Sequence, residues 1–169
     1  VGHAQLRQRG ARAWAEALEP LGVRTAQALL VADDIDFRAR FVNAHRTLHT
    51  LLDRGVLPII NENDTVSFDE IRLGDNDRLS ALAAGLVGAD LLVMLSSADG
   101  VRTGGGRGEI IPVITDIAAA RVHAGGAVSD VGTGGMITKL DAAQTAREMG
   151  TPVVIALGAE PGVLGRILN

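Results

Sequence analysis

The chain has 169 residues, a length typical of one domain, and 47% of them are apolar, which suffices for a packed core and argues against disorder. The lack of cysteine excludes disulfide scaffolds, cysteine-ligated zinc, iron–sulfur clusters and thiol nucleophiles. A net charge of −4 and 2% aromatic residues argue against a nucleic-acid partner, and no apolar run approaches the ~20 residues that cross a membrane. We therefore expect one cytoplasmic domain over residues 1–169, with no nucleic-acid or membrane partner.

Helical spacing of apolar residues and short continuous apolar runs alternate along the chain. Helices are predicted over residues 4–21, from Asp33 and Asp34 to about residue 54, and over 79–87, 116–122 and 136–149. Strands are predicted over residues 25–31, 56–60, 91–95 and 153–156, with a further short strand over 110–114. This alternation is typical of an α/β fold whose parallel sheet is covered on both faces. Ligands of such sheets bind beyond the carboxyl ends of the strands.

The first polar segment, residues 61–77, follows one predicted strand directly and leads into the next helix. It reads NENDTVSFDEIRLGDND and contains six carboxylates and three asparagines. Such side chains can bind the ammonium and carboxylate of an amino acid, or hold a hard cation through oxygen atoms. A solvated loop is the alternative, because Asn and Asp also favour turns. The residue pattern does not match an EF-hand.

The second polar segment, residues 125–139, reads GGAVSDVGTGGMITK and ends with Lys139, the only lysine of the chain. A glycine-rich segment that leads into a helix presents backbone N–H groups to an anion, and Lys139 adds a cation suited to phosphate. Neither a P-loop nor a dinucleotide-binding motif is present. The alternative is an ordinary loop with a surface lysine.

Two smaller features also carry candidate chemistry. Ser96 and Ser97 follow a predicted strand, but no G-x-S-x-G turn surrounds them, which argues against a serine hydrolase. His45 and His49 lie four residues apart on a predicted helix, which is the spacing of a metal pair. Arg46 occupies the position of the zincin glutamate, and a solvated helix surface is the favoured interpretation.

Four strings, PIINENDTV, DEIRLGDNDRLSALAA, GTGGMITKLDAA and VVIALGAEPGVL, closely resemble the glutamate kinases of the amino acid kinase family, in that order and over nearly the whole chain. The resemblance implies a three-layer αβα sandwich around a mostly parallel sheet. It also implies an enzyme that uses ATP and Mg²⁺ to phosphorylate the γ-carboxylate of L-glutamate to γ-glutamyl phosphate, the first step of proline biosynthesis. A homo-oligomer and feedback inhibition by proline are further implications.

The resemblance also assigns residues to roles. The glutamate site would comprise Asn61, Asp64, Asp75 and Asn76. Asp77 would orient the catalytic lysines, and Lys139 would be catalytic. The nucleotide site would comprise Ser96, Ser97, Thr133, Gly134, Gly135, Met136, Ile137, Thr138 and Lys139, with no metal ligands from the chain. Ser96-Ser97 stands where the family has Thr-Asp, so the loss of a carboxylate there is expected to alter nucleotide affinity or base choice.

The family opens with a strand, a Lys-x-Gly-Ser-Ser loop and a Ser-Ser-Gly-Ala loop, and many members end in an RNA-binding-type (PUA) domain; this chain shows none of these. We therefore expect an N-terminally truncated kinase domain with little activity of its own. The alternatives are a non-catalytic fragment that binds an amino acid or forms oligomers, another member such as an acetylglutamate, aspartate or carbamate kinase, and a metal-binding module.

Overall fold

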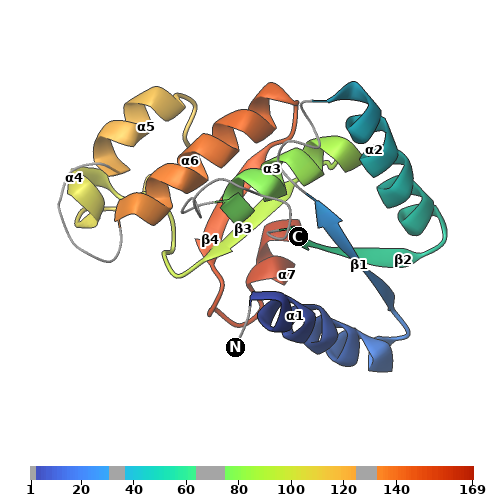
Figure 1. Cartoon of the computed structure of the whole chain (residues 1–169). Coiled ribbons are helices and arrows are strands. Elements are labelled where there is room, and N and C mark those ends of the chain that lie inside the picture. The colour runs from blue at the N-terminus through green and yellow to red at the C-terminus, as the bar shows by residue number, and fades with distance from the viewer. Residues whose placement is uncertain (1–2, 31–36, 64–74, 125–132) are drawn as a thin grey trace. The chain divides into compact units, whose positions relative to one another are not determined.

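Residues 3–30, 37–63, 75–124 and 133–169 are described by the computed structural model of the chain (Figure 1). The chain divides into two compact units, Val1–Gly88 and Ala89–Asn169. In its described residues, each unit contains one pair of parallel strands with helices packed on it, so the predicted α/β class with parallel strands is confirmed. No helix within the described ranges is both long and apolar enough to cross a membrane.

The first unit is built on strands β1 and β2, which pair in parallel from Arg24 opposite Val56 to Leu30 opposite Glu62. Its elements are α1 (His3–Leu18), the short 3-10 helix η1 (Glu19–Leu21), β1 (Arg24–Leu30), α2 (Arg38–Asp53), β2 (Val56–Glu62) and α3 (Asp75–Val87). Gly55 adopts a φ of 65° between α2 and β2, a left-handed conformation that glycine accepts without strain.

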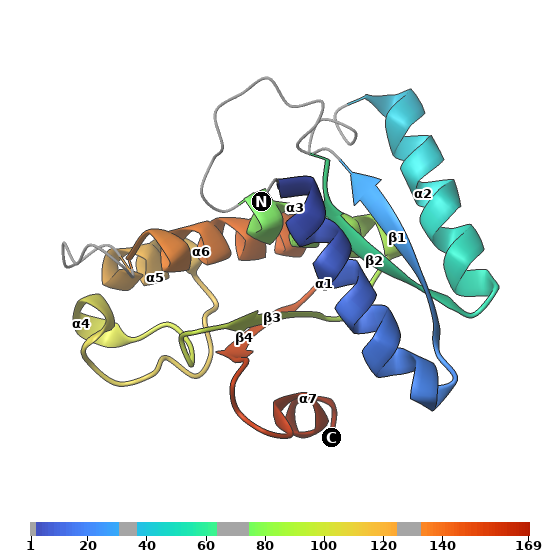
Figure 2. The ribbon, with the colours of Figure 1, turned by 60° about the horizontal axis from the view of Figure 1, so that its bottom comes forward.

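One face of the β1–β2 pair carries the core of the first unit. Leu30 of β1, Leu48 of α2 and Leu86 of α3 are buried together there, so α2 and α3 cover the same face. Helix α1 also contacts both strands, and Figures 1 and 2 show it on the side of the pair away from α2. The strand pair is thus held between helices on both sides, as expected for parallel strands.

The second unit is built on strands β3 and β4, which pair in parallel from Leu92 opposite Val153 to Ser96 opposite Leu157. Its elements are β3 (Leu92–Ser96), α4 (Thr103–Gly106), α5 (Ile117–Ala124), α6 (Thr133–Glu148), β4 (Val153–Leu157) and α7 (Val163–Leu168). Its core joins Ile117 and Ala120 of α5 to Leu140 and Ala143 of α6, and Ile155 of β4 packs against them.

The structure corrects several predicted boundaries. The short strand predicted over residues 110–114 is wrong: Ile110 forms one isolated bridge with Arg102, and Pro112 removes a backbone donor from the segment. Helices α3 and α6 begin at Asp75 and Thr133, earlier than predicted, because residues that favour turns also suit a first helical turn. Helix α7 was not predicted, and the predicted helix start at residues 33 and 34 lies outside the described residues.

Candidate active site

The carboxyl end of β2 holds the first predicted ligand-binding residue. Asn61 pairs with Leu29 of β1, and its side-chain Oδ1 accepts the backbone N–H of Glu62 at 2.9 Å. The next residue, Asn63, donates its N–H to the carbonyl of Leu30 at 2.9 Å, so the end of β2 stays beside the end of β1. The strand pair therefore fixes the backbone at Asn61. The predicted residue Asp64 lies outside the described residues.

The first turn of α3 holds three more predicted residues, Asp75, Asn76 and Asp77. Asn76 is exposed and Asp77 is half-buried. The backbone carbonyl of Asp77 accepts a hydrogen bond of 2.7 Å from the Ser80 hydroxyl, within the same helix. Buried Leu79 joins α3 to the core of the first unit. The first turn is thus anchored two residues beyond Asp77, and it combines amide N–H groups with carboxylates, as an amino-acid ligand requires.

The first unit therefore contains Asn61, Asn76 and Asp77 on two elements that pack together, β2 and α3. Their chemistry is mixed. A carboxylate can hold an ammonium group, an amide side chain can both donate and accept, and helix N–H groups favour an anion. Such a set suits a small zwitterion better than a phosphate.

In the second unit, Ser96 ends β3, and its polar groups bond to the turn that follows β3 and to the residue that follows β4. Its carbonyl accepts the N–H of Gly158 at 2.8 Å, and its Oγ accepts the N–H of Ala98 at 3.3 Å. A Cβ at Gly158 would lie 3.2 Å from the Cβ of Leu95, closer than most such contacts, so glycine allows this approach. Ser97 is exposed and follows the strand directly.

A clamp on the next turn was not predicted from the sequence. The Arg102 guanidinium donates to both carboxylate oxygens of Asp99, at 2.7 and 3.1 Å, and to the carbonyl of Gly108 at 2.8 Å. The hydrogen bond from Arg102, more than its charge, lowers the pKa of the Asp99 carboxyl below its ordinary value. The D-x-x-R spacing could have suggested an ion pair between Asp99 and Arg102. It could not have suggested the hydrogen bond to the carbonyl of Gly108, because that bond depends on the conformation of the loop.

Helix α6 carries the predicted nucleotide residues of the second segment. Met136 and Ile137 are partly buried and pack against the core of the second unit. The Thr138 hydroxyl donates to the carbonyl of Gly135 at 3.0 Å. Lys139 lies in the second turn and is half-buried, next to Leu140, which is 1% exposed. Thr133, Gly134 and Gly135, which precede the predicted start of the helix at residue 136, belong to its first turn, and the side chain of Thr133 is not described.

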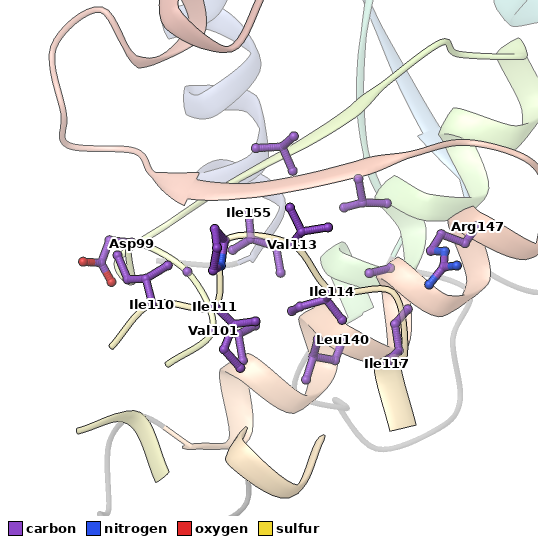
Figure 3. A pocket seen from close by; sticks show the side chains of 15 residues that line it. Asp99, Val101, Ile110, Ile111, Val113, Ile114, Ile117, Leu140, Arg147 and Ile155 are labelled. Atoms are coloured by element: carbon purple, nitrogen blue, oxygen red, sulfur yellow. The ribbon is translucent and has the colours of Figure 1, made fainter. Parts of the chain in front are cut away.

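A cavity of about 480 Å³ in the second unit is lined by none of the predicted glutamate- or nucleotide-binding residues. It lies between β4 and α6, with Asp99 at one end and Arg147 at the other (Figure 3). Its lining is mostly apolar, and Arg147 donates to the carbonyl of Thr115 at 3.1 Å. Its lining lacks the converging polar groups that a charged substrate requires. The predicted residues, and not this cavity, remain the candidate site.

The predicted residues are divided between the two units. Asn61, Asn76 and Asp77 belong to the first unit, and the residues from Ser96 to Lys139 belong to the second. Among the described residues, no group of three or more His, Cys, Asp or Glu side chains is arranged to hold a metal ion. Each group therefore has a separate chemical character, one acidic and amide-rich, the other with amide N–H groups and one lysine.

Comparisons with known proteins relate this chain to a family of kinases. Residues 7–157 match the Amino acid kinase family. The "Glutamate 5-kinase" of Geobacter sulfurreducens is 50% identical over 157 residues, which cover 90% of this chain and 42% of that protein. The "Glutamate 5-kinase" of Deinococcus radiodurans is 50% identical over 156 residues, 89% of this chain and 43% of that protein. The "Glutamate 5-kinase" of Escherichia coli O1:K1 / APEC is 44% identical over 174 residues, 100% of this chain and 46% of that protein.

The chain thus spans less than half the length of these curated relatives. The match to the family profile, however, runs through both units and includes the end of β2, the first turns of α3 and α6, and β4. On this match, the chain belongs to the amino acid kinase family.

Proposed function

We propose that the chain carries part of the active site of an ATP-dependent kinase. This enzyme would phosphorylate the γ-carboxylate of L-glutamate to γ-glutamyl phosphate, the first step of proline biosynthesis. The observation that carries the proposal is the pair of separate polar sites in a chain 44–50% identical to relatives named "Glutamate 5-kinase". We further propose that residues 1–169 form one incomplete kinase domain. The whole enzyme would be a cytoplasmic homo-oligomer, and proline would inhibit it.

In this proposal, the first unit binds glutamate. Asp64 and Asp75 hold the α-ammonium group, since an ammonium is best balanced by carboxylates. Asn61 and Asn76 donate amide hydrogens to the substrate carboxylates and fix their orientation. Asn61 suits this role because its backbone is fixed by β-pairing. The acceptor carboxylate is ionised at neutral pH, so no general base is needed.

The second unit binds MgATP in the same proposal. The first turn of α6, residues 133–136, offers backbone N–H groups without helical partners, and Thr138 and the hydroxyls of Ser96 and Ser97 complete the nucleotide site. Lys139 neutralises charge on the transferring phosphoryl group. Asp77, which belongs to the first unit, takes the role that the family resemblance implies, which is to orient the catalytic lysines. Phosphoryl transfer depends on this kind of positioning and charge balance more than on covalent chemistry. Mg²⁺ arrives bound to the nucleotide.

The proposal is tested by ADP release. The chain is compared with a chimera in which the N-terminal segment of the Geobacter sulfurreducens relative precedes Val1, because the relatives are more than twice as long. We expect ADP release from the chimera that requires L-glutamate and Mg²⁺. N-acetylglutamate, aspartate and carbamate serve as control acceptors. A preference for any of these would replace the glutamate assignment, and nucleotide binding without transfer in both proteins would favour a non-catalytic role.

A further inference from the structure

Three aromatic rings form a ladder along one face of α2. Phe41, His45 and His49 are spaced four residues apart, about one helical turn each. The ring centres of Phe41 and His45 are 6.2 Å apart with planes at 28°, and those of His45 and His49 are 4.2 Å apart with planes at 35°. The two imidazoles are thus held closer to each other than His45 is to Phe41. No part of the proposed kinase reaction uses them.

The helix beneath the two imidazoles is firmly anchored. Leu48, which directly precedes His49, is 0% exposed, and Ala44, which directly precedes His45, is 7% exposed. Both belong to the core of the first unit, so the backbone at each histidine has little freedom. His45 is exposed and His49 half-buried, so solvent reaches the pair. An anchored helix with two neighbouring accessible imidazoles is a pre-organised pair of nitrogen ligands.

From this geometry we propose that His45 and His49 together bind one divalent transition-metal ion. A metal–imidazole bond of ~2.0–2.1 Å puts each ring centre about 3 Å from the ion, so two rings at an N–metal–N angle of roughly 90–110° have centres about 4–5 Å apart. The ring centres of His45 and His49, 4.2 Å apart, fall in that range. Rotation about the soft terminal torsion of an exposed histidine turns both lone pairs toward one ion. Water fills the other coordination positions, because the described residues offer no third ligand there.

The ligands and the surrounding charge define the class of metal. Neutral imidazole favours Zn²⁺, Ni²⁺ and Cu²⁺ over Mg²⁺ and Ca²⁺, which prefer oxygen. Arg46 lies beside His45 on the same helix and is exposed, so its charge opposes any dication. The site therefore selects ions that form strong bonds to nitrogen, in the order Cu²⁺ above Ni²⁺ and Zn²⁺. The Mg²⁺ of the proposed kinase reaction is not a competitor.

The experiment isolates this pair from the two other histidines of the chain. A background variant, H3Q/H123Q, leaves His45 and His49 as the only imidazoles. Ni²⁺ and Zn²⁺ are titrated into it by calorimetry, and circular dichroism checks that each variant is folded. We expect one ion per chain and a thermal midpoint that rises with the concentration of either metal. Mg²⁺ is the negative control, and a shift with Mg²⁺ of the same size would overturn the proposal.

Two further variants in this background, H45Q and H49Q, each remove one ligand. We expect either substitution to weaken Ni²⁺ binding by at least ~10-fold. Losing a residue that only hydrogen-bonds to a metal ligand already weakens metal binding by about 10-fold or more, and here a ligand itself is lost. Arg46→Gln, which removes the opposing charge and no ligand, should strengthen binding. Unchanged affinity in either histidine variant, or no saturable binding in the background, would overturn the proposal. Neither readout depends on kinase activity, so the result stands apart from the proposed function.

Discussion

Each unit is built on its own pair of parallel strands, but the charged residues of the proposed ligand sites differ between the units. They are carboxylates in the first unit and a lysine in the second. In the first unit, β2 runs on to Asn63, which still bonds to the carbonyl of Leu30, and the segment that follows is rich in carboxylates. In the second unit, β3 ends at Ser96, where a turn closes on itself, and the charged group comes from Lys139 on a helix. An ammonium ligand needs the first arrangement and a phosphate needs the second. In the proposed function, the same strand arrangement therefore supports a site for an ammonium group in the first unit and a site for phosphate in the second.

The strongest test of this comparison replaces one residue in each unit and compares the effects of the two substitutions on catalysis. Lys139→Met in the second unit should lower the rate of phosphoryl transfer by at least ~10²-fold, the loss seen when one stabilising donor is removed from a transition state. Asn76→Ala in the first unit should instead raise the KM for glutamate, since it removes a donor to the substrate. Both are measured by ADP release in the chimera.

The matched control for Lys139→Met is Lys139→Arg. It keeps the charge but changes the donor geometry, so it should recover part of the rate. If Lys139→Met raises only the KM for glutamate, or Asn76→Ala lowers only turnover, the proposal that the first unit binds glutamate and the second unit binds the nucleotide is wrong.

A second test asks whether the two units unfold separately. Leu48 and Leu140, 0% and 1% exposed, are the central side chains of the first and second units. Replacing either with Ala should lower the free energy of unfolding of its own unit by ~2–5 kcal/mol. Trp14, the only tryptophan of the chain, lies in the first unit. In urea, Leu48→Ala should shift the fluorescence midpoint, whereas Leu140→Ala should shift mainly the helical signal of circular dichroism.

Leu168→Ala is the control for both core substitutions, because Leu168 is 71% exposed and its loss should change stability by less than ~0.5 kcal/mol. Equal shifts of both signals by both core variants would mean that the chain unfolds as one cooperative body.

The pattern of apolar residues was enough to predict the four strands of the described residues and the helices that pack on them. The pattern failed where the local conformational preference of a segment differs from the conformation that the folded protein gives it. Asp75 and Thr133 look like loop residues because their side chains compete for backbone groups, yet the same property suits the first turn of a helix. The apolar run at 110–114 resembles a strand, but its side chains line a cavity beside β4. The hydrogen bond from Arg102 to the carbonyl of Gly108 depends on the conformation of a loop, which the spacing of apolar residues does not predict.

A smaller effect is expected at the start of β4. Thr151 is the one buried polar residue among those described, at 3% exposed, and its hydroxyl donates to the carbonyl of Ala89 at 3.3 Å. Thr151→Val keeps the shape and removes the donor, so it should lower the free energy of unfolding by ~1 kcal/mol, a typical net value for one hydrogen bond. Thr151→Ser keeps the donor and loses a methyl group. Chemical denaturation of the two variants separates the hydrogen bond from the packing, and a greater loss in Thr151→Ser would assign the role to packing.

The smallest effect concerns the turn after β3, where Arg102 lowers the pKa of Asp99. Because the folded pKa lies below the unfolded one, this pair stabilises the fold above the unfolded pKa, near ~3.9. That contribution disappears as the pH falls through the folded pKa. Arg102→Gln should therefore raise the pKa of Asp99 toward its ordinary value, as measured by carboxyl NMR. Arg102→Lys keeps the charge but not the two-bond fork, and hydrogen bonding is the larger cause. The lysine variant should then restore only a minor part of the depression, whereas full restoration would mean that charge alone holds this turn.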